Sequence, residues 1–199
     1  MQKKAIVLAS ASPRRKEILQ EMGLTFSIEP AEVDESAVKG STPSKLTKNL
    51  SLTKARATLI AHGERMTNRV GECKDDFAVI GADTVVVLGK EILGKPKDCE
   101  DAVKMLLKLS GKWHKVYTGT TVIVGDKTLS FCVRSSVKFK KLTVDSAKAY
   151  VDKCNPLDKA GAYGIQDKEV VKKYRGSYTN IVGLPKEKLA RVLRRAEVI

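Results

Sequence analysis

The chain has 199 residues, of which 42% are hydrophobic and 30% charged, and its formal net charge at pH 7 is +14. This length suffices for one sizeable hydrophobic core, and we expect a single α/β domain over residues 1–199. No apolar run approaches membrane-spanning length and the start lacks a signal-peptide core, which predicts a soluble, intracellular protein that does not bind membranes. The four cysteines show no C-x-x-C pair, which argues against a zinc site or a disulfide framework.

The positive charge predicts attraction to polyanions, which include nucleotides and nucleic acids. Only 5% of the residues are aromatic, and no aromatic cluster interleaves with the basic residues along the chain. A surface that binds single-stranded nucleic acid needs such aromatic platforms. The sequence therefore disfavours nucleic acid as a partner.

The first elements predict a phosphate-binding helix start. An apolar strand over residues 4–8 runs into a helix that Ser12 can cap and whose first position suits Pro13. Arg14 and Arg15 add two cations to a helix end that already attracts anions. Ser10 and Ser12 fit this picture as hydrogen-bond donors to phosphate. An ordinary capped helix with solvated arginines is the alternative.

The next segments bring acidic and basic groups. The first helix ends at Gly23, residues 26–28 are extended, and a turn over residues 31–41 carries Glu32, Asp34 and Glu35. Thr42 and Pro43 start a second helix, whose predicted inward stripe consists of Leu46, Leu50, Ala57 and Ile60. Lys54 falls on this stripe, so its side chain either extends outward to water or faces a polar cleft.

Residues 63–76 are charged and aperiodic and predict an exposed excursion. Residues 77–88 then form a nearly continuous buried-strand pattern that is interrupted by Asp83 and Thr84. An unpaired carboxylate in such surroundings is too costly, so Asp83 must meet a cation, a metal ion or hydrogen-bond donors. The alternative is an aspartate that caps a loop at the end of a strand.

The second half predicts further alternation of strands and helices. Gly89-Lys90 turns the chain, Asp98 caps a helix that ends at Ser110-Gly111, and a hairpin joins residues 116–124 to 128–139. A short helix over 144–153, a small-residue loop over 158–166 and a C-terminal helix from about Pro185 follow. His114 has no nucleophile placed beside it by the sequence, so we expect a structural role.

Together these segments resemble the Maf family of nucleotide pyrophosphatases, which is related in fold to the inosine triphosphate pyrophosphatases. The resemblance spans nearly the whole chain. It rests on Ser10-Ala11-Ser12-Pro13-Arg14-Arg15, Asp34-Glu35, Lys54-Ala55, Gly81-Ala82-Asp83-Thr84, Lys95-Pro96, Ser110-Gly111 with His114, residues 158–166 and Gly183-Leu184-Pro185. It implies a mixed twisted sheet flanked by helices, with two lobes around a central cleft.

The resemblance also implies an activity. The Asp83-Thr84 pair and the loop that ends in Gln166 look like the branch that hydrolyses dTTP and UTP to the monophosphate and pyrophosphate. Members of the family are magnesium-dependent, or use another divalent cation such as Mn²⁺, and are usually cytoplasmic homodimers. They remove unwanted nucleotides from the pool, and the family has been associated with septum formation.

Residue roles follow from the chemistry of phosphate-anhydride hydrolysis and from the resemblance. The cations expected to clamp the phosphate chain are Arg14, Arg15, Lys54 and Lys95. Glu35 and Asp83 are expected to hold the metal, and Asp83 to orient or deprotonate the attacking water. The resemblance marks Arg14, Thr84 and Gln166 as selectivity positions, and Thr and Gln can pair with a pyrimidine edge.

The sequence departs from the family pattern at Asn155-Pro156, where Glu-Pro is common, which puts any role of that carboxylate in doubt. A basic nucleic-acid-binding or cell-division regulatory protein on the same fold is the rival function, and it would use the same arginines on phosphate backbones. A pyrophosphatase of the same fold that prefers other nucleotides is a third possibility. Release of pyrophosphate from a panel of nucleotides separates the three.

Overall fold

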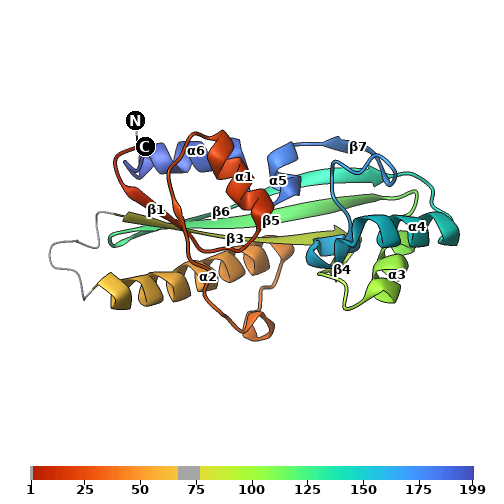
Figure 1. Ribbon diagram of the computed structural model, residues 1–199, viewed down its shortest axis with the longest axis horizontal. Coiled ribbons are helices and arrows are strands. Elements are labelled where there is room, and N and C mark those ends of the chain that lie inside the picture. The colour runs from red at the N-terminus through yellow and green to blue at the C-terminus, as the bar shows by residue number, and fades with distance from the viewer. Residues whose placement is uncertain (1, 67–76) are drawn as a thin grey trace. The chain divides into compact units, whose positions relative to one another are not determined.

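The computed structural model describes residues 2–66 and 77–199 (Figure 1). The chain divides into two compact units, each assembled from separate stretches of sequence. Unit 1 comprises Met1–Asp83, Thr118–Val133 and Gly183–Ile199, and unit 2 comprises Thr84–Tyr117 and Arg134–Val182. No described helix has the length and apolar character needed to cross a membrane.

The strands form one mixed sheet, as expected. They are β1 (Ala5–Leu8), β2 (Ser27–Ile28), β3 (Phe77–Leu88), β4 (Glu91–Leu93), β5 (Trp113–Val124), β6 (Lys127–Phe139) and β7 (Val171–Arg175). Their order is β2-β1-β3-β5-β6-β7, with β4 paired to β3. β1 runs parallel to β2 and β3, whereas β4 and β7 run antiparallel to their partners. The strand predicted over residues 77–88 is confirmed.

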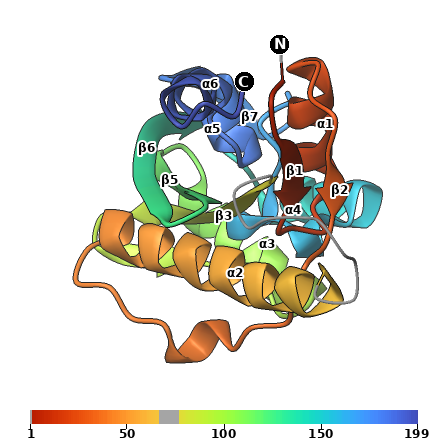
Figure 2. The same cartoon turned by 90° about the vertical axis from the view of Figure 1, so that its left-hand side faces the viewer.

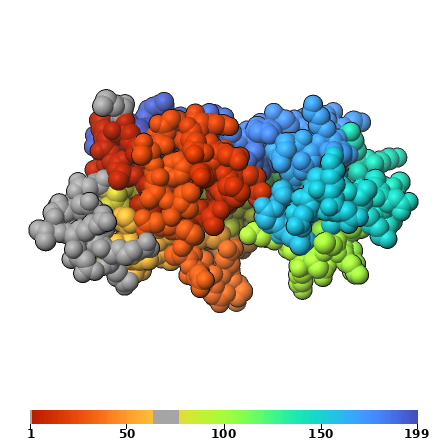
Figure 3. Space-filling view, in the orientation of Figure 1, coloured from red at the N-terminus to blue at the C-terminus, as the bar shows by residue number. Residues whose placement is uncertain are grey.

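Unit 1 places its helices on both faces of its part of the sheet. These helices are α1 (Pro13–Glu21), the short turn η1 (Glu35–Ala37), α2 (Pro43–Met66) and α6 (Lys186–Arg195). In two perpendicular views α2 lies on one side of the strands and α1 and α6 on the other (Figures 1 and 2). In the space-filling view the N-terminal segment, red to orange, forms most of the visible surface of this unit (Figure 3).

The buried face of α2 differs from the prediction. Leu50 is buried, as expected, but Ile60, also expected to point inward, is 63% exposed. The described residues of the helix with no exposed surface are Thr47, Ser51, Ala55 and Thr58. The sheet opposes these small side chains with two glycines. A Cβ on Gly81 would collide with the Ser51 carbonyl oxygen, and one on Gly119 with the Thr47 carbonyl group. The helix backbone therefore lies directly on the strands, which hydrophobic periodicity does not reveal.

The ends of the predicted helices are mostly confirmed. Pro13 opens α1, and Gly23 closes it at φ +69, where the Leu24 amide donates to the Leu19 carbonyl at 3.2 Å. The predicted cap at Ser12 is wrong, because its side chain accepts no capping hydrogen bond from any described residue. Instead the Ser12 amide donates a hydrogen bond to Ser10 Oγ at 3.3 Å.

The predicted excursion over residues 63–76 is only partly described. Helix α2 continues to Met66, so the first residues of that stretch are helical. The rest, residues 67–76 with Cys73, lies outside the described residues. The three described cysteines, Cys99, Cys132 and Cys154, are free thiols, as expected.

Unit 2 packs helices α3 (Cys99–Leu109), α4 (Val144–Cys154) and α5 (Tyr178–Val182) and the turns η2 (Pro156–Asp158) and η3 (Ala160–Ala162) with its strands. Asp98 caps α3 by accepting from the Asp101 amide at 2.7 Å, which confirms the prediction. The hydrophobic core of unit 2 contains Leu106, Val137, Phe139 and Tyr163. His114 lies within this unit with Nε2 2.8 Å from the Tyr163 hydroxyl, in agreement with a structural role.

Asn155, which stands where Glu is common in the family pattern, lies at a backbone turn. It ends α4 in the left-handed conformation, at φ 37, and its side chain is exposed. Asn tolerates this conformation better than other residues that carry a Cβ. In this chain the position serves the backbone turn between α4 and η2.

Candidate active site

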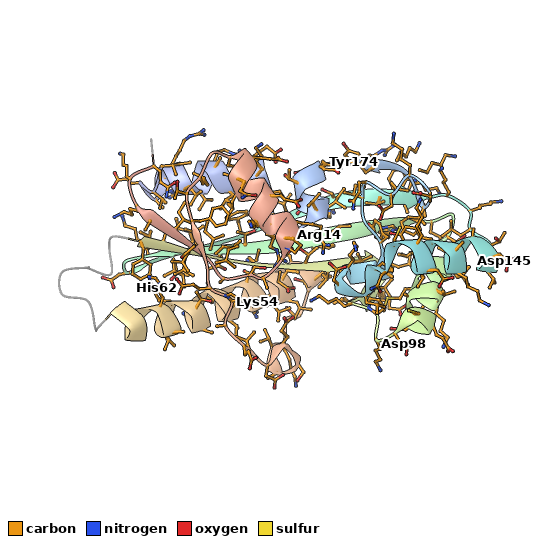
Figure 4. The ribbon with its side chains drawn as sticks, viewed as in Figure 1. Arg14, Lys54, His62, Asp98, Asp145 and Tyr174 are labelled. Atoms are coloured by element: carbon orange, nitrogen blue, oxygen red, sulfur yellow. The ribbon has the colours of Figure 1, made fainter. Side chains whose placement is uncertain are left out.

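Asp83 meets a cation, as its burial predicted. It lies in the middle of β3, with a side chain only 10% exposed, so the alternative of a loop-capping aspartate is wrong. The Nζ atom of Lys54 donates to Asp83 Oδ1 at 2.6 Å. Because alternate strand residues share a face, Asp83 lies on the side of β3 where Gly81 meets α2. The close contact of helix and strand therefore brings Lys54, which is labelled in Figure 4, to Asp83.

A second carboxylate completes an acidic pair around Lys54. Glu35 Oε1 lies 2.9 Å from Lys54 Nζ, and the Glu35 side chain is 52% exposed. The turn that carries it is fixed by Asp34, whose Oδ1 accepts from the Ser36 amide at 2.9 Å. Hydrogen bonds from Ser36 lower the pKa of the Asp34 carboxyl. Lys54, at 15% exposure, thus faces polar groups rather than solvent.

Arg15 is held by neutral oxygens of the protein. Its Nη1 donates to Ser10 Oγ at 2.8 Å, and its Nε donates to the Gly183 carbonyl at 3.0 Å. Burial lowers the pKa of Arg15, and the nearby charge of Asp83 opposes this effect. Arg15 thereby ties the loop after β1 to the segment that precedes α6. The Gly183 carbonyl is a partner that the sequence reasoning missed, because only folding brings residues 15 and 183 together.

Arg14 lies in the first turn of α1 and is half-buried (Figure 4). Its charge contributes to lowering the pKa of Arg15, and the charge of Glu35 contributes to raising it. Unit 1 therefore gathers the predicted residues Ser10, Arg14, Arg15, Glu35, Lys54 and Asp83 around one cluster of charges. Their assignments to phosphate and metal stay predictions.

Ser12 also belongs to unit 1, and the remaining predicted site residues belong to unit 2. Thr84 follows Asp83 in β3 and is half-buried, whereas Lys95 and Gln166 are exposed on two separate loops. A hydrogen bond of 2.9 Å from the Gly161 amide to the Gly94 carbonyl joins these loops. The Gly161 backbone, at φ +71, also lies against Val86, as a small-residue loop predicted. Selectivity for a base remains a prediction for Arg14, Thr84 and Gln166.

Two residues that were not predicted shape the Gln166 loop. Asp167 Oδ2 accepts from the Tyr150 hydroxyl at 2.5 Å and from the Gly164 amide at 2.9 Å. Burial, with the hydrogen bond to Asp167, raises the pKa of Tyr150 well above its ordinary value. A Cβ on Gly164 would collide with the Gln166 amide, so the side chain of Gln166 folds back over its own loop.

The chemistry of the acidic pair fits magnesium. Mg²⁺ prefers hard oxygen ligands and is commonly held by one or two carboxylates together with substrate phosphates. Asp83 and Glu35 both form an ion pair with the Lys54 ammonium, so their carboxylates lie close to the same position. Within residues 2–66 and 77–199 no group of three or more His, Cys, Asp or Glu side chains is placed to hold a metal ion. An ion held by these two carboxylates would take its other ligands from water or from substrate phosphates.

The chain is similar to several known proteins. The family model described as "Maf-like protein" matches residues 5–196. A dTTP/UTP pyrophosphatase of Bacillus thuringiensis subsp. konkukian is 44% identical over 97% of this chain and 96% of its own. A dTTP/UTP pyrophosphatase of Bacillus cereus is 43% identical over 98% of this chain and 91% of its own. Among solved structures, the Staphylococcus aureus Ham1 protein is 19% identical, with a TM-score of 0.43 over 68% of this chain and 72% of that one. The match to the family model over nearly the full length means that this chain belongs to the Maf-like family.

Proposed function

We propose that this protein hydrolyses dTTP and UTP to the nucleoside monophosphate and pyrophosphate, and so clears these nucleotides from the pool. The observation that carries the proposal is the buried Asp83 carboxylate, held by Lys54 beside Glu35 and Arg15. The similarity to dTTP/UTP pyrophosphatases over 97% of the chain supports it.

Asp83 is the candidate base. A carboxylate positioned beside the reacting phosphate orients a water molecule and accepts its proton as the water attacks the α-phosphorus, while pyrophosphate leaves. Lys54 fixes the direction of this carboxylate through the 2.6 Å contact. The low exposure of Asp83 excludes competing water around it.

Cations neutralise the polyanionic substrate. In this proposal Arg14 and Lys95 bind phosphate oxygens directly. Arg15 holds Ser10 and the Gly183 carbonyl, so it also positions the loop that precedes α1. The exposed Lys95 reaches solvent from its loop and has the length to meet a phosphate.

We propose Mg²⁺, or another divalent cation such as Mn²⁺, as the cofactor, held by Asp83 and Glu35. When bound, it would neutralise phosphate charge and favour ionisation of water. The family resemblance further predicts a cytoplasmic homodimer, which sedimentation velocity of the purified protein would test. A role in septum formation is a separate prediction, testable by cell morphology on deletion of the gene.

Base selectivity is proposed to depend on Thr84, Gln166 and Arg14, since a site that hydrogen-bonds one base edge leaves polar groups unmatched with another. Purine triphosphates should then be poor substrates. A pyrophosphatase that prefers other nucleotides would be revealed by the same panel.

The test is pyrophosphate release from each nucleoside triphosphate with magnesium present. Asp83→Asn should lower the turnover of dTTP and UTP by roughly 10²- to 10⁴-fold, because it removes the base but keeps the shape. Asp126→Asn is the matched control, since Asp126 is an exposed turn residue of the same unit. Full activity of Asp83→Asn, or no turnover of any nucleotide by the wild type, would refute the proposal.

A further inference from the structure

One face of the sheet in unit 2 is basic and exposed. His114 and Val116 of β5 point into the core of this unit, so by strand alternation Trp113 and Lys115 point to the opposite side. The same alternation places Arg134 and Lys138 of β6 on that side, because Val137 and Phe139 are buried in the core.

The edge strand β7 adds two more cations to this surface. Lys173 pairs in register with Lys138, and Arg175 with Ser136, so both share their face. We call the set the basic sheet face: Trp113, Lys115, Arg134, Lys138, Lys173 and Arg175. The strands β5, β6 and β7 contain no Asp or Glu.

An aromatic ring lies among these charges. Trp113 is 38% exposed, with Lys173 Nζ 5.8 Å and Arg175 Cζ 5.1 Å from its ring centroid. Both contacts are within the range of cation–π attraction. Lys138 Nζ donates to the Gly111 carbonyl at 2.6 Å, which steadies the chain just before Trp113. In the described part of the chain neither Lys173 nor Arg175 has a carboxylate in an ion pair with it.

Folding brings one aromatic ring and two cations together in unit 2, which the order of residues along the chain does not indicate. Trp113 and Arg175 are far apart in sequence, and pairing through β6 brings them together. The linear sequence could not show this platform because its members come from three strands.

We propose that the basic sheet face binds single-stranded nucleic acid, with a base stacked on Trp113 and the backbone phosphates on the surrounding cations. Stacking platforms flanked by cations are how sequence-tolerant single-strand binding is achieved. A second copy of this face would be repelled by like charge. A purely acidic peptide would leave the exposed tryptophan ring unused, and a duplex would not offer it an unpaired base.

Trp113 gives a direct measurement, because it is the only tryptophan in the chain. A deoxyadenosine oligomer is the probe, since the proposed active site disfavours adenine. We expect it to quench the tryptophan fluorescence as it binds, and its affinity to fall steeply with added salt. A heparin chain or a DNA duplex that quenches equally and binds as tightly would overturn the proposal.

Matched variants locate the surface, with binding followed by anisotropy of a labelled oligomer. Lys173→Ala with Arg175→Ala should flatten the plot of log affinity against log salt by about 1.4, for two lost phosphate contacts. Lys188→Ala with Arg194→Ala removes the same charge from exposed positions of α6 in unit 1 and should leave the slope unchanged. Equal losses in the two pairs would mean that net charge alone attracts the oligomer.

The aromatic contribution has its own control. Trp113→Ala should weaken binding by roughly 10-fold, the loss expected for one stacked base. Tyr174, labelled in Figure 4, is 45% exposed and alternates to the opposite side of β7 from Lys173 and Arg175, so Tyr174→Ala should bind normally. Pyrophosphate release by each variant verifies the fold. Asp83→Asn should bind the oligomer like wild type, which keeps this test separate from the proposed enzymatic function.

Discussion

The Nζ atom of Lys54 lies 2.6 Å from Oδ1 of Asp83, although the two residues are 29 positions apart in the chain. Lys54 belongs to α2 and Asp83 to β3, so the pair depends on the close approach of this helix to this strand. The same ammonium lies 2.9 Å from Glu35. One lysine therefore compensates two carboxylates at the candidate active site.

The first prediction concerns this pair. Lys54→Met should lower the free energy of unfolding by about 1–3 kcal/mol, because it leaves the mostly buried Asp83 without its partner. The loss should shrink in an Asp83→Asn background, since the charge to be compensated is then absent. Urea unfolding of the four proteins of this cycle measures the coupling. Lys45→Met, at an exposed position of the same helix, is the control, and strict additivity would contradict the coupling.

The second prediction separates the two arginines of α1. Arg15→Ala should lower stability by about 1.5–3 kcal/mol, because its hydrogen bonds to Ser10 and Gly183 are lost. Arg14→Ala should mainly raise the KM for dTTP if Arg14 binds phosphate, with a smaller change in stability. Thermal unfolding and steady-state kinetics of both variants decide the matter. Unchanged kinetics in Arg14→Ala would remove it from the phosphate site.

The third prediction tests the contact of α2 with the sheet. Gly81→Ala should destabilise unit 1 strongly, by more than about 3 kcal/mol, since the added methyl group meets the Ser51 carbonyl of the helix backbone. Gly63→Ala is the matched control within α2, where a Cβ meets nothing within 4 Å. It should stabilise the helix by about 0.5–1 kcal/mol. Similar effects of the two substitutions on urea unfolding would contradict the close approach.

The fourth prediction concerns acid stability. Burial lowers the pKa of His114 from its ordinary value of 6.5 to about 4. The unfolded chain then binds this proton more tightly, so stability should fall as the pH drops from about 6.5 to 4, by about 3 kcal/mol in total.

His114→Gln should remove this part of the pH dependence. His62→Gln is the natural control, because the chain has only two histidines. Unfolding by urea across this pH range provides the comparison. An unchanged pH profile in His114→Gln would show that another group governs acid unfolding.

Local patterns in the sequence determined the elements and the chemical demand at the site. The apolar run over residues 77–88 predicted a buried strand, and Asp98 and Gly23 marked helix ends. The burial of Asp83 in that strand required a compensating group. These features could be predicted because they depend on neighbours within a few residues. Tertiary structure decided that Lys54 is that group. It also decided that α2 buries Ser51 and Ala55 and exposes Ile60, because close backbone packing against Gly81 outweighs one apolar side chain.

The same division holds for the surface of unit 2. Composition showed an excess of positive charge, but a net charge does not tell where on the surface the charged side chains lie. Pairing of β7 with β6 placed Lys173 and Arg175 beside Trp113, and no short-range pattern encodes that register. Contacts between remote residues arise only when strands associate, and for this reason the partners of Asp83, Arg15 and Trp113 had to come from the folded structure.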